Sequence, residues 1–119
     1  MSQKQINPRA KELVEICQQV LDVELGAIVA SRKIQSLAFE LYTDYGIPKV
    51  LDPFIGIDSQ TDHLPVGPER RHWSTEALQK KDLKITECEL FFWEVAIEAA
   101  RKTIEVYAKA FETNSQPEK

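Results

Sequence analysis

The sequence predicts an all-α protein, a small helical bundle of three main helices and one short helix, with a long ordered loop between the second and third main helices. Apolar residues recur at spacings of three and four along most of the chain, which is typical of amphipathic helices packed on a core. One stretch, residues 54–73, breaks this pattern and contains two of the four glycines, two of the six prolines and both histidines. Because this stretch is rich in apolar, charged and aromatic residues, we expect an ordered loop and not a linker.

Length and composition indicate one globular domain spanning residues 1–119. A chain of 119 residues can bury a core without disulfides or metals. Its 43% hydrophobic and 29% charged residues are typical of soluble proteins. We expect an ordered core over about residues 7–112, with flexible tails at 1–6 and 113–119.

Several classes of protein are disfavoured by the same data. No apolar run is long enough for a bilayer, and the first residues lack the apolar segment of a secretory signal, so we expect a cytoplasmic protein without a membrane partner. The net charge of −4 disfavours nucleic acid as a partner on electrostatic grounds. Cys17 and Cys88 lie in apolar helical patterns, which predicts two buried thiols without a disulfide.

The first two helices are predicted from their boundaries and apolar spacing. The first begins at Asn7-Pro8, with Asn as the N-cap and Pro at the first helical position. Its buried face is expected to comprise Leu13, Ile16, Cys17, Val20 and Leu21. After a short break near Gly26, the second helix ends at Gly46, which supplies a left-handed cap. Its buried face is expected to comprise Ala30, Ile34, Leu37, Ala38, Leu41 and Tyr45.

Two helices are predicted after the loop. Ser74 or Thr75 is expected to cap a short helix over residues 76–81. Thr86 and Glu89 have the spacing of a capping box, which predicts that the longest helix begins there and covers residues 86–112. Its core stripe comprises Trp93, Ala96, Ile97, Ala100, Ile104, Tyr107 and Phe111.

A second apolar stripe runs beside the core stripe of this last helix. It comprises Phe92, Val95, Ala99, Val106 and Ala110. A helix on the outside of a small bundle needs only one apolar stripe. The second stripe either packs under the loop or forms an interface with another copy of the chain, and we expect the latter.

The loop holds the residues that could form a site. These candidates are Asp58, Ser59, Thr61, Asp62, His63, Arg70, Arg71, His72 and Trp73. Carboxylates with imidazoles can bind zinc, manganese or iron, so Asp58, Asp62, His63 and His72 are the residues that a metal would use. The plainer interpretation, that these side chains close turns, is favoured, and we expect no metal and no other cofactor.

The arginines of the loop also have two interpretations. Arg70 and Arg71 with Trp73 are residue types that grip phosphates and stack on bases. The favoured alternative is that one arginine forms an ion pair with Asp58 or Asp62 and so stabilises the loop, while Trp73 packs in the core. A nucleophilic site at Ser59 is disfavoured because no nucleophile-elbow pattern surrounds it.

The segment Ile57-Asp58-Ser59-Gln60-Thr61-Asp62-His63-Leu64-Pro65-Val66-Gly67, with the arginines and Trp73-Ser74 that follow, resembles a signature of a family of small uncharacterised bacterial proteins. In that pattern a glutamate often stands where Gln60 stands here. The resemblance implies a helical bacterial domain and supplies no activity. The missing carboxylate at position 60 weakens the metal hypothesis.

Taken together, these features predict a non-enzymatic cytoplasmic bacterial accessory or interaction protein. Its expected partners are a second copy of itself, giving a homodimer, and a protein whose identity the sequence does not supply. One alternative is a metal-dependent enzyme centred on the loop. The other is a toxin-neutralising immunity protein, since many small acidic proteins bind basic partners.

Overall fold

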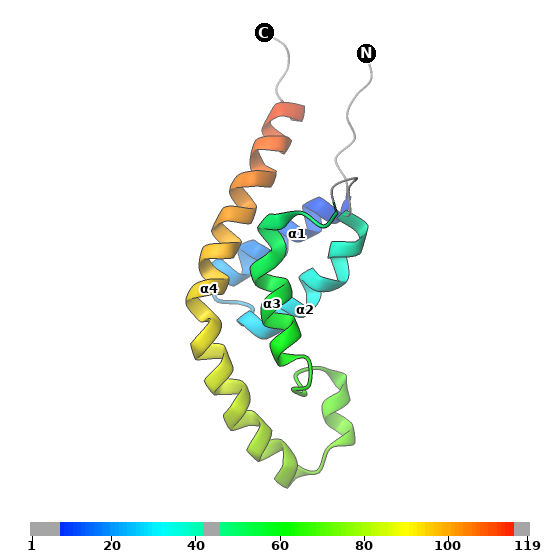
Figure 1. Cartoon of the computed structure of the whole chain (residues 1–119), viewed down its shortest axis with the longest axis vertical. Coiled ribbons are helices and arrows are strands. Elements are labelled where there is room, and N and C mark those ends of the chain that lie inside the picture. Colours follow the sequence, from blue (N-terminus) through cyan, green and yellow to red (C-terminus); the bar gives the residue numbers. More distant parts are fainter. Residues whose placement is uncertain (1–7, 42–45, 116–119) are drawn as a thin grey trace.

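The computed structural model describes residues 8–41 and 46–115, and for residues 109–115 it describes the backbone alone. The all-helical class is confirmed, with no β-strand among these residues. The helices and 3-10 turns are α1 (Pro8–Leu21), α2 (Ala27–Ala38), η1 (Phe39–Leu41), η2 (Lys49–Leu51), α3 (Asp52–Thr61), η3 (Pro68–His72) and α4 (Thr75–Ser115). Helices α1, α2 and α3 pack together beside the middle of α4 (Figure 1).

The core lies where these three helices meet α4. Leu13, Val20 and Ile34 from α1 and α2 are fully buried, as is Phe54 from α3. Helix α4 contributes small side chains, since the buried residues among its described side chains are Ala96, Ala99, Ala100 and Thr103. Small residues let helix backbones approach closely. The larger members of its predicted core stripe, Trp93, Ile97, Ile104 and Tyr107, flank this contact half-buried, and the side chain of Phe111 lies outside the description.

The predicted boundaries of the first two helices are confirmed in part. Helix α1 begins at Pro8, and a break over residues 22–26 separates it from α2. Asn7 and Tyr45 lie outside the described residues. Helix α2 ends at Ala38, earlier than predicted, and the chain continues into η1. Gly46 does adopt the expected left-handed backbone, with φ of +98°.

A helix replaces the first half of the predicted loop. Residues 52–61 form α3, which also excludes a strand at residues 54–57. Pro53 stands in the first turn, where its missing N–H needs no partner, and Phe54, Ile57 and Thr61 recur on one buried face. Gly56 disfavours a helix locally, but its cost of about 1 kcal/mol is small beside the burial of Phe54.

Gly56 offers a test of this account of α3. Nothing lies within 4 Å of the position that a Cβ would take at Gly56. We therefore expect Gly56→Ala to stabilise the protein by about 1 kcal/mol in urea unfolding. Gly46→Ala is the matched control, because the left-handed backbone there should make it destabilising by roughly 1–2 kcal/mol. A loss of stability in Gly56→Ala would contradict the helix.

The last predicted boundary, a helix starting at residue 86, is wrong. One continuous helix of 41 residues runs from Thr75 to Ser115. Ser74 caps it, since its Oγ accepts a hydrogen bond from the N–H of Ala77 at 3.1 Å. The segment contains neither proline nor glycine, so nothing in the chain interrupts the helix between the predicted short and long elements.

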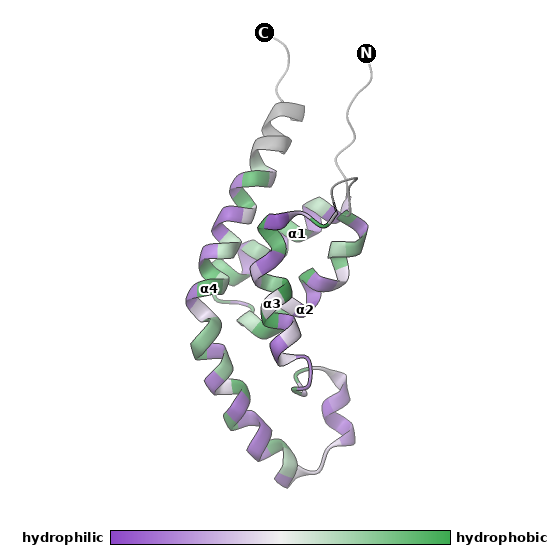
Figure 2. Cartoon of the chain, viewed as in Figure 1, coloured by the Kyte–Doolittle hydropathy of each residue, from purple (hydrophilic) through white to green (hydrophobic). Residues whose placement is uncertain are grey.

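The long helix sets the shape of the molecule, whose principal extents are 62 × 23 × 22 Å. The N-terminal end of α4 extends beyond α1, α2 and α3 (Figure 1), and we call residues 75–88 of this helix the arm. Hydrophobic and hydrophilic residues alternate along this part of the helix (Figure 2). No helix among the described residues is both long enough and apolar enough to span a membrane.

Both cysteines are free thiols, and only one of them is buried as predicted. Cys17 lies in the core, where burial raises the pKa of its thiol to about 12. Cys88 is half-buried on α4 and reaches the surface between α4 and the end of α3. The prediction of two buried thiols is therefore wrong for Cys88, because α4 leaves the bundle near this residue.

Candidate functional site

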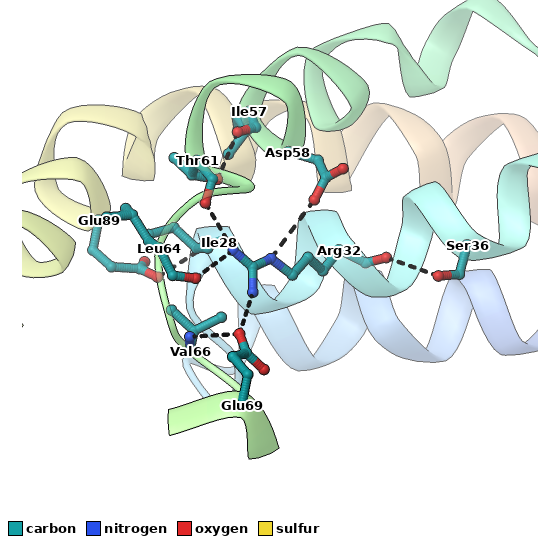
Figure 3. A network of polar contacts seen from close by, with 10 residues as sticks. All are labelled: Ile28, Arg32, Ser36, Ile57, Asp58, Thr61, Leu64, Val66, Glu69 and Glu89. Atoms are coloured by element: carbon teal, nitrogen blue, oxygen red, sulfur yellow. Dashed lines mark hydrogen bonds and ion pairs between the residues drawn. The ribbon is translucent and has the colours of Figure 1, made fainter. Parts of the chain in front are cut away.

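The connection between α3 and α4 is held to α2 by Arg32 (Figure 3). One guanidinium nitrogen donates to the carbonyl oxygens of Thr61 and Leu64, both at 2.7 Å. The other donates to Glu69 Oε2 at 3.1 Å, and Nε lies 3.8 Å from Asp58 Oδ1. Arg32 thus joins α2 to the last turn of α3 and to the start of η3. The carbonyl of Thr61 is at a helix C-terminus, where a cation is favourable.

The carboxylates around Arg32 differ in their electrostatics. Desolvation raises the pKa of Asp58, and the nearby Asp62 adds to this, while the charge of Arg32 opposes it. The pKa of Glu69 is lowered, chiefly by a hydrogen bond from its own backbone N–H, with the N–H groups of Gly67 and Val66 and the charge of Arg32 contributing. The side chain of Asp58 is only 17% exposed. The ionised form of Asp58 therefore depends on Arg32 more strongly than the ionised form of Glu69 does.

A second contact ties η3 to α4. Arg70 donates two hydrogen bonds to the carboxylate of Asp82, at 2.7 and 3.1 Å, and one to the carbonyl oxygen of Pro65 at 3.0 Å. The bond from Arg70 lowers the pKa of Asp82. Next to it, the ammonium of Lys81 lies 5.7 Å from the ring centroid of Trp73, within range of a cation–π contact.

The predicted pairing within the loop is therefore not the one found. Asp58 pairs with Arg32, and Arg70 pairs with Asp82. Within the described part of the chain, Asp62 and Arg71 are exposed and make no hydrogen bond or ion pair. The reason is that α3 turns Asp58 toward α2, while η3 turns Arg70 toward the arm. Both partners come from helices outside residues 54–73.

The remaining loop candidates are dispersed. Ser59, His63 and His72 are exposed, and Trp73 is half-buried. Thr61 is buried, and its hydroxyl donates to the carbonyl of Ile57 at 2.7 Å. Among the described residues, no three His, Cys, Asp or Glu side chains come together in a way that could hold a metal ion. The four residues named for a metal do not converge.

His63, a loop candidate, and Phe92, an interface candidate, both line a groove between the end of α3 and helix α4. The groove has a volume of about 370 Å³. It is lined by Gln60, His63, Lys84, Glu87, Cys88, Phe91 and Phe92. Phe91 and Phe92 stand edge to face, with their ring centroids 4.9 Å apart. The groove is thus an open hollow with aromatic walls and charges at its rim.

The second apolar stripe of α4 is divided by the structure. Ala99 is buried in the core and Phe92 is half-buried, whereas Val95 and Val106 are about half exposed. The side chain of Ala110 lies outside the description. The most exposed apolar residues of α4 are others, Leu83 at 71%, Leu90 at 75% and Phe91 at 76%. We call Leu83, Leu90, Phe91 and Val95 the outer face of α4.

Glu89 has a role that the capping-box prediction missed. Its carboxylate accepts hydrogen bonds from the N–H groups of Ala27, at 2.7 Å, and Ile28, at 3.0 Å. Gly26, the N-cap of α2, has no side chain to do this. Glu89 therefore caps α2 from another helix, 62 residues away in sequence. The pattern around Thr86 does not predict such a long-range cap.

Arg32 and Glu89 thus fix the walls of the groove, one through α3 and the other through α4. The signal that could have found Arg32 is a charged residue inside the apolar pattern of the second helix, next to the buried Ser31.

Comparison of the chain with protein-family models, with curated proteins and with solved structures finds no match in any of the three. The resemblance to a bacterial loop signature therefore stays a prediction.

Proposed function

We propose that the protein is a non-enzymatic interaction protein of the bacterial cytoplasm, and that it acts as a homodimer through the outer face of α4. The observation that carries this proposal is the exposure of Leu83, Leu90 and Phe91, each more than 70% open to solvent. Large exposed apolar residues gathered on one surface are typical of interaction sites.

The outer face is distinct from the surface that α4 gives to its own core. At 100° per residue, Leu83, Leu90, Phe91 and Val95 fall within one stripe along the helix. Ala96, Ala100 and Thr103, which are fully buried, fall on the opposite side. Folding of the chain therefore satisfies one face of α4 and leaves the other for a partner.

The energetics are adequate for reversible association. Complete burial of one leucine or phenylalanine side chain is worth roughly 1.5–3 kcal/mol. A homodimer buries each residue of the outer face twice, once in each copy. This gain must exceed the cost of lost translational and rotational freedom, which is about 4–15 kcal/mol. The free energy gained by burying the outer face in both copies is near this range. The groove beside Phe91 adds further surface that a partner can bury.

Light scattering tests the proposal. We expect the unmodified protein to show twice the chain mass at micromolar concentration, and Leu83→Glu or Phe91→Glu to show the monomer mass. The matched control is Phe39→Glu, which removes another exposed phenylalanine, at 66%, from η1 on a different surface. A monomeric parent protein would refute the proposal, and so would a Phe39→Glu variant that dissociates as fully as Phe91→Glu.

A further inference from the structure

The charges along α4 change sign near Glu87. Before this point the arm carries three lysines, Lys80, Lys81 and Lys84, which outnumber its two acidic residues, Glu76 and Asp82. From residue 85 to residue 98 the helix carries four glutamates, Glu87, Glu89, Glu94 and Glu98, and neither lysine nor arginine. A helix with this pattern matches a second copy of itself only when the two run in opposite directions, because parallel copies would oppose lysine to lysine and glutamate to glutamate.

Several of these charges are already engaged within the chain. Glu89 caps α2, Glu98 lies near Arg101 and Lys102, and Lys81 lies over Trp73. Lys80 and Glu94 are exposed and, within the described ranges, take part in no hydrogen bond or ion pair. Lys84 reaches only the edge of pairing distance from Glu87, at 4.0 Å. Lys80, Glu94 and Lys84 are therefore available to a partner.

We propose that the homodimer is an antiparallel pair of α4 helices whose two-fold axis passes near Glu87. This inference rests on the proposed function and adds the arrangement of the two copies. With the axis at Glu87, Leu83 of one copy faces Phe91 of the other, and Lys80 faces Glu94. The same register brings Lys84 close to Glu87 of the second copy, which offsets the approach of the two Glu87 carboxylates.

The surroundings of α4 fit this register. Leu83 of the second copy lies at the groove beside Phe91, whose aromatic walls can receive a leucine side chain. Lys80 of the second copy lies at a hollow of about 330 Å³ lined by Pro53, Glu94, Val95, Glu98, Ala99 and Lys102. The contacts of η3 with α4, at Lys81 and Asp82, are on another side of the helix and leave the outer face open.

Cross-linking of single cysteines tests the arrangement, in a background with Cys88→Ser and with the buried Cys17 retained. Glu87→Cys and Glu94→Cys are a matched pair, since both positions are exposed and lie one heptad apart. In the antiparallel pair, the two thiols introduced by Glu87→Cys meet at the axis, whereas those introduced by Glu94→Cys are separated by about 21 Å along the helices, at 1.5 Å per residue. A short bis-maleimide should join Glu87→Cys into dimers and leave Glu94→Cys uncoupled.

The outcomes separate this inference from the proposed function. If light scattering of the unmodified protein gives a monomer, the proposed function fails. If the protein is dimeric and both variants cross-link equally, the helices are parallel, and the antiparallel inference is overturned while the homodimer stands. If the protein is dimeric and neither variant cross-links, the interface lies elsewhere, which also overturns it. As a positive control, Lys80→Cys mixed with Glu94→Cys should give a cross-linked heterodimer.

Discussion

Arg32→Ala is expected to destabilise the protein by roughly 2–4 kcal/mol, because it leaves two carbonyl oxygens and a largely buried carboxylate without their partner. The carbonyls are those of Thr61 and Leu64, and the carboxylate is Asp58. Urea unfolding would measure the loss. Lysine keeps the charge but lacks the planar fork that reaches several acceptors at once, so Arg32→Lys should recover only a minor part of the stability.

The loss should also depend on pH. The pKa of Asp58 is raised in the folded protein, so the folded state binds the proton more firmly than the unfolded state does. Stability from this group is therefore present at low pH and falls as pH rises from the unfolded pKa through the folded pKa. Removing Arg32 removes the charge that opposes this shift. The loss of unfolding free energy in Arg32→Ala should therefore be smaller at acidic pH.

The control for Arg32 is Arg9→Ala, at an exposed arginine whose carboxylate partners are exposed as well. Ion pairs on the surface are screened by solvent, so this variant should unfold at nearly the same urea concentration as the parent protein. An equally small change for Arg32→Ala would show that the connection is not held by this residue.

Glu89→Ala is expected to destabilise the protein by about 2–3 kcal/mol, since the N–H groups of two fully buried residues, Ala27 and Ile28, lose a charged acceptor. Glu89→Gln retains one acceptor oxygen and should fall between the parent protein and Glu89→Ala. Glu105→Ala, an exposed glutamate of the same helix, is the control and should change stability by less than about 0.5 kcal/mol.

A double-mutant cycle with Gly26 sharpens this test. A Cβ at position 26 would lie 2.7–2.9 Å from the carboxylate atoms of Glu89, although the backbone of Gly26 has an ordinary φ of −78°. Gly26→Ala should therefore destabilise the parent protein by displacing the cap and should cost much less in the Glu89→Ala background. Additive effects would mean that the carboxylate of Glu89 does not cap α2.

The parts of this fold that could be predicted are those determined locally. Pro8 starts α1, Ser74 caps α4, and the buried face of α1 follows from its own apolar spacing. The parts that could not be predicted depend on contacts between distant residues. Phe54 and Ile57 form a helix across Gly56 because the core buries them, and Glu89 signals a local helix start while it caps another helix.

The candidate site shows the same division. The sequence identified the loop as the region of interest and predicted an ion pair within it, whereas Asp58 and Arg70 each pair with a residue outside the loop. It placed both halves of each pair inside the loop because only neighbours in sequence are visible at that level. Arg32 precedes Thr61 by 29 residues, and Asp82 follows Arg70 by 12. The shared exposed surface of Leu83 and Leu90 was not predicted for a further reason. The predicted helix start at residue 86 separated these two residues, which lie on one helix.

The continuity of α4 has a consequence for how a partner would be met. The arm shares one uninterrupted ladder of backbone hydrogen bonds with the part of α4 that is fixed in the core. Its backbone is therefore ordered when the chain folds, and the conformational entropy lost in that ordering belongs to folding and not to association. A segment that became helical only on contact would lose that entropy at the moment of binding. The outer face is in this sense a preorganised surface, and the affinity it can reach is limited by its complementarity rather than by the cost of forming it.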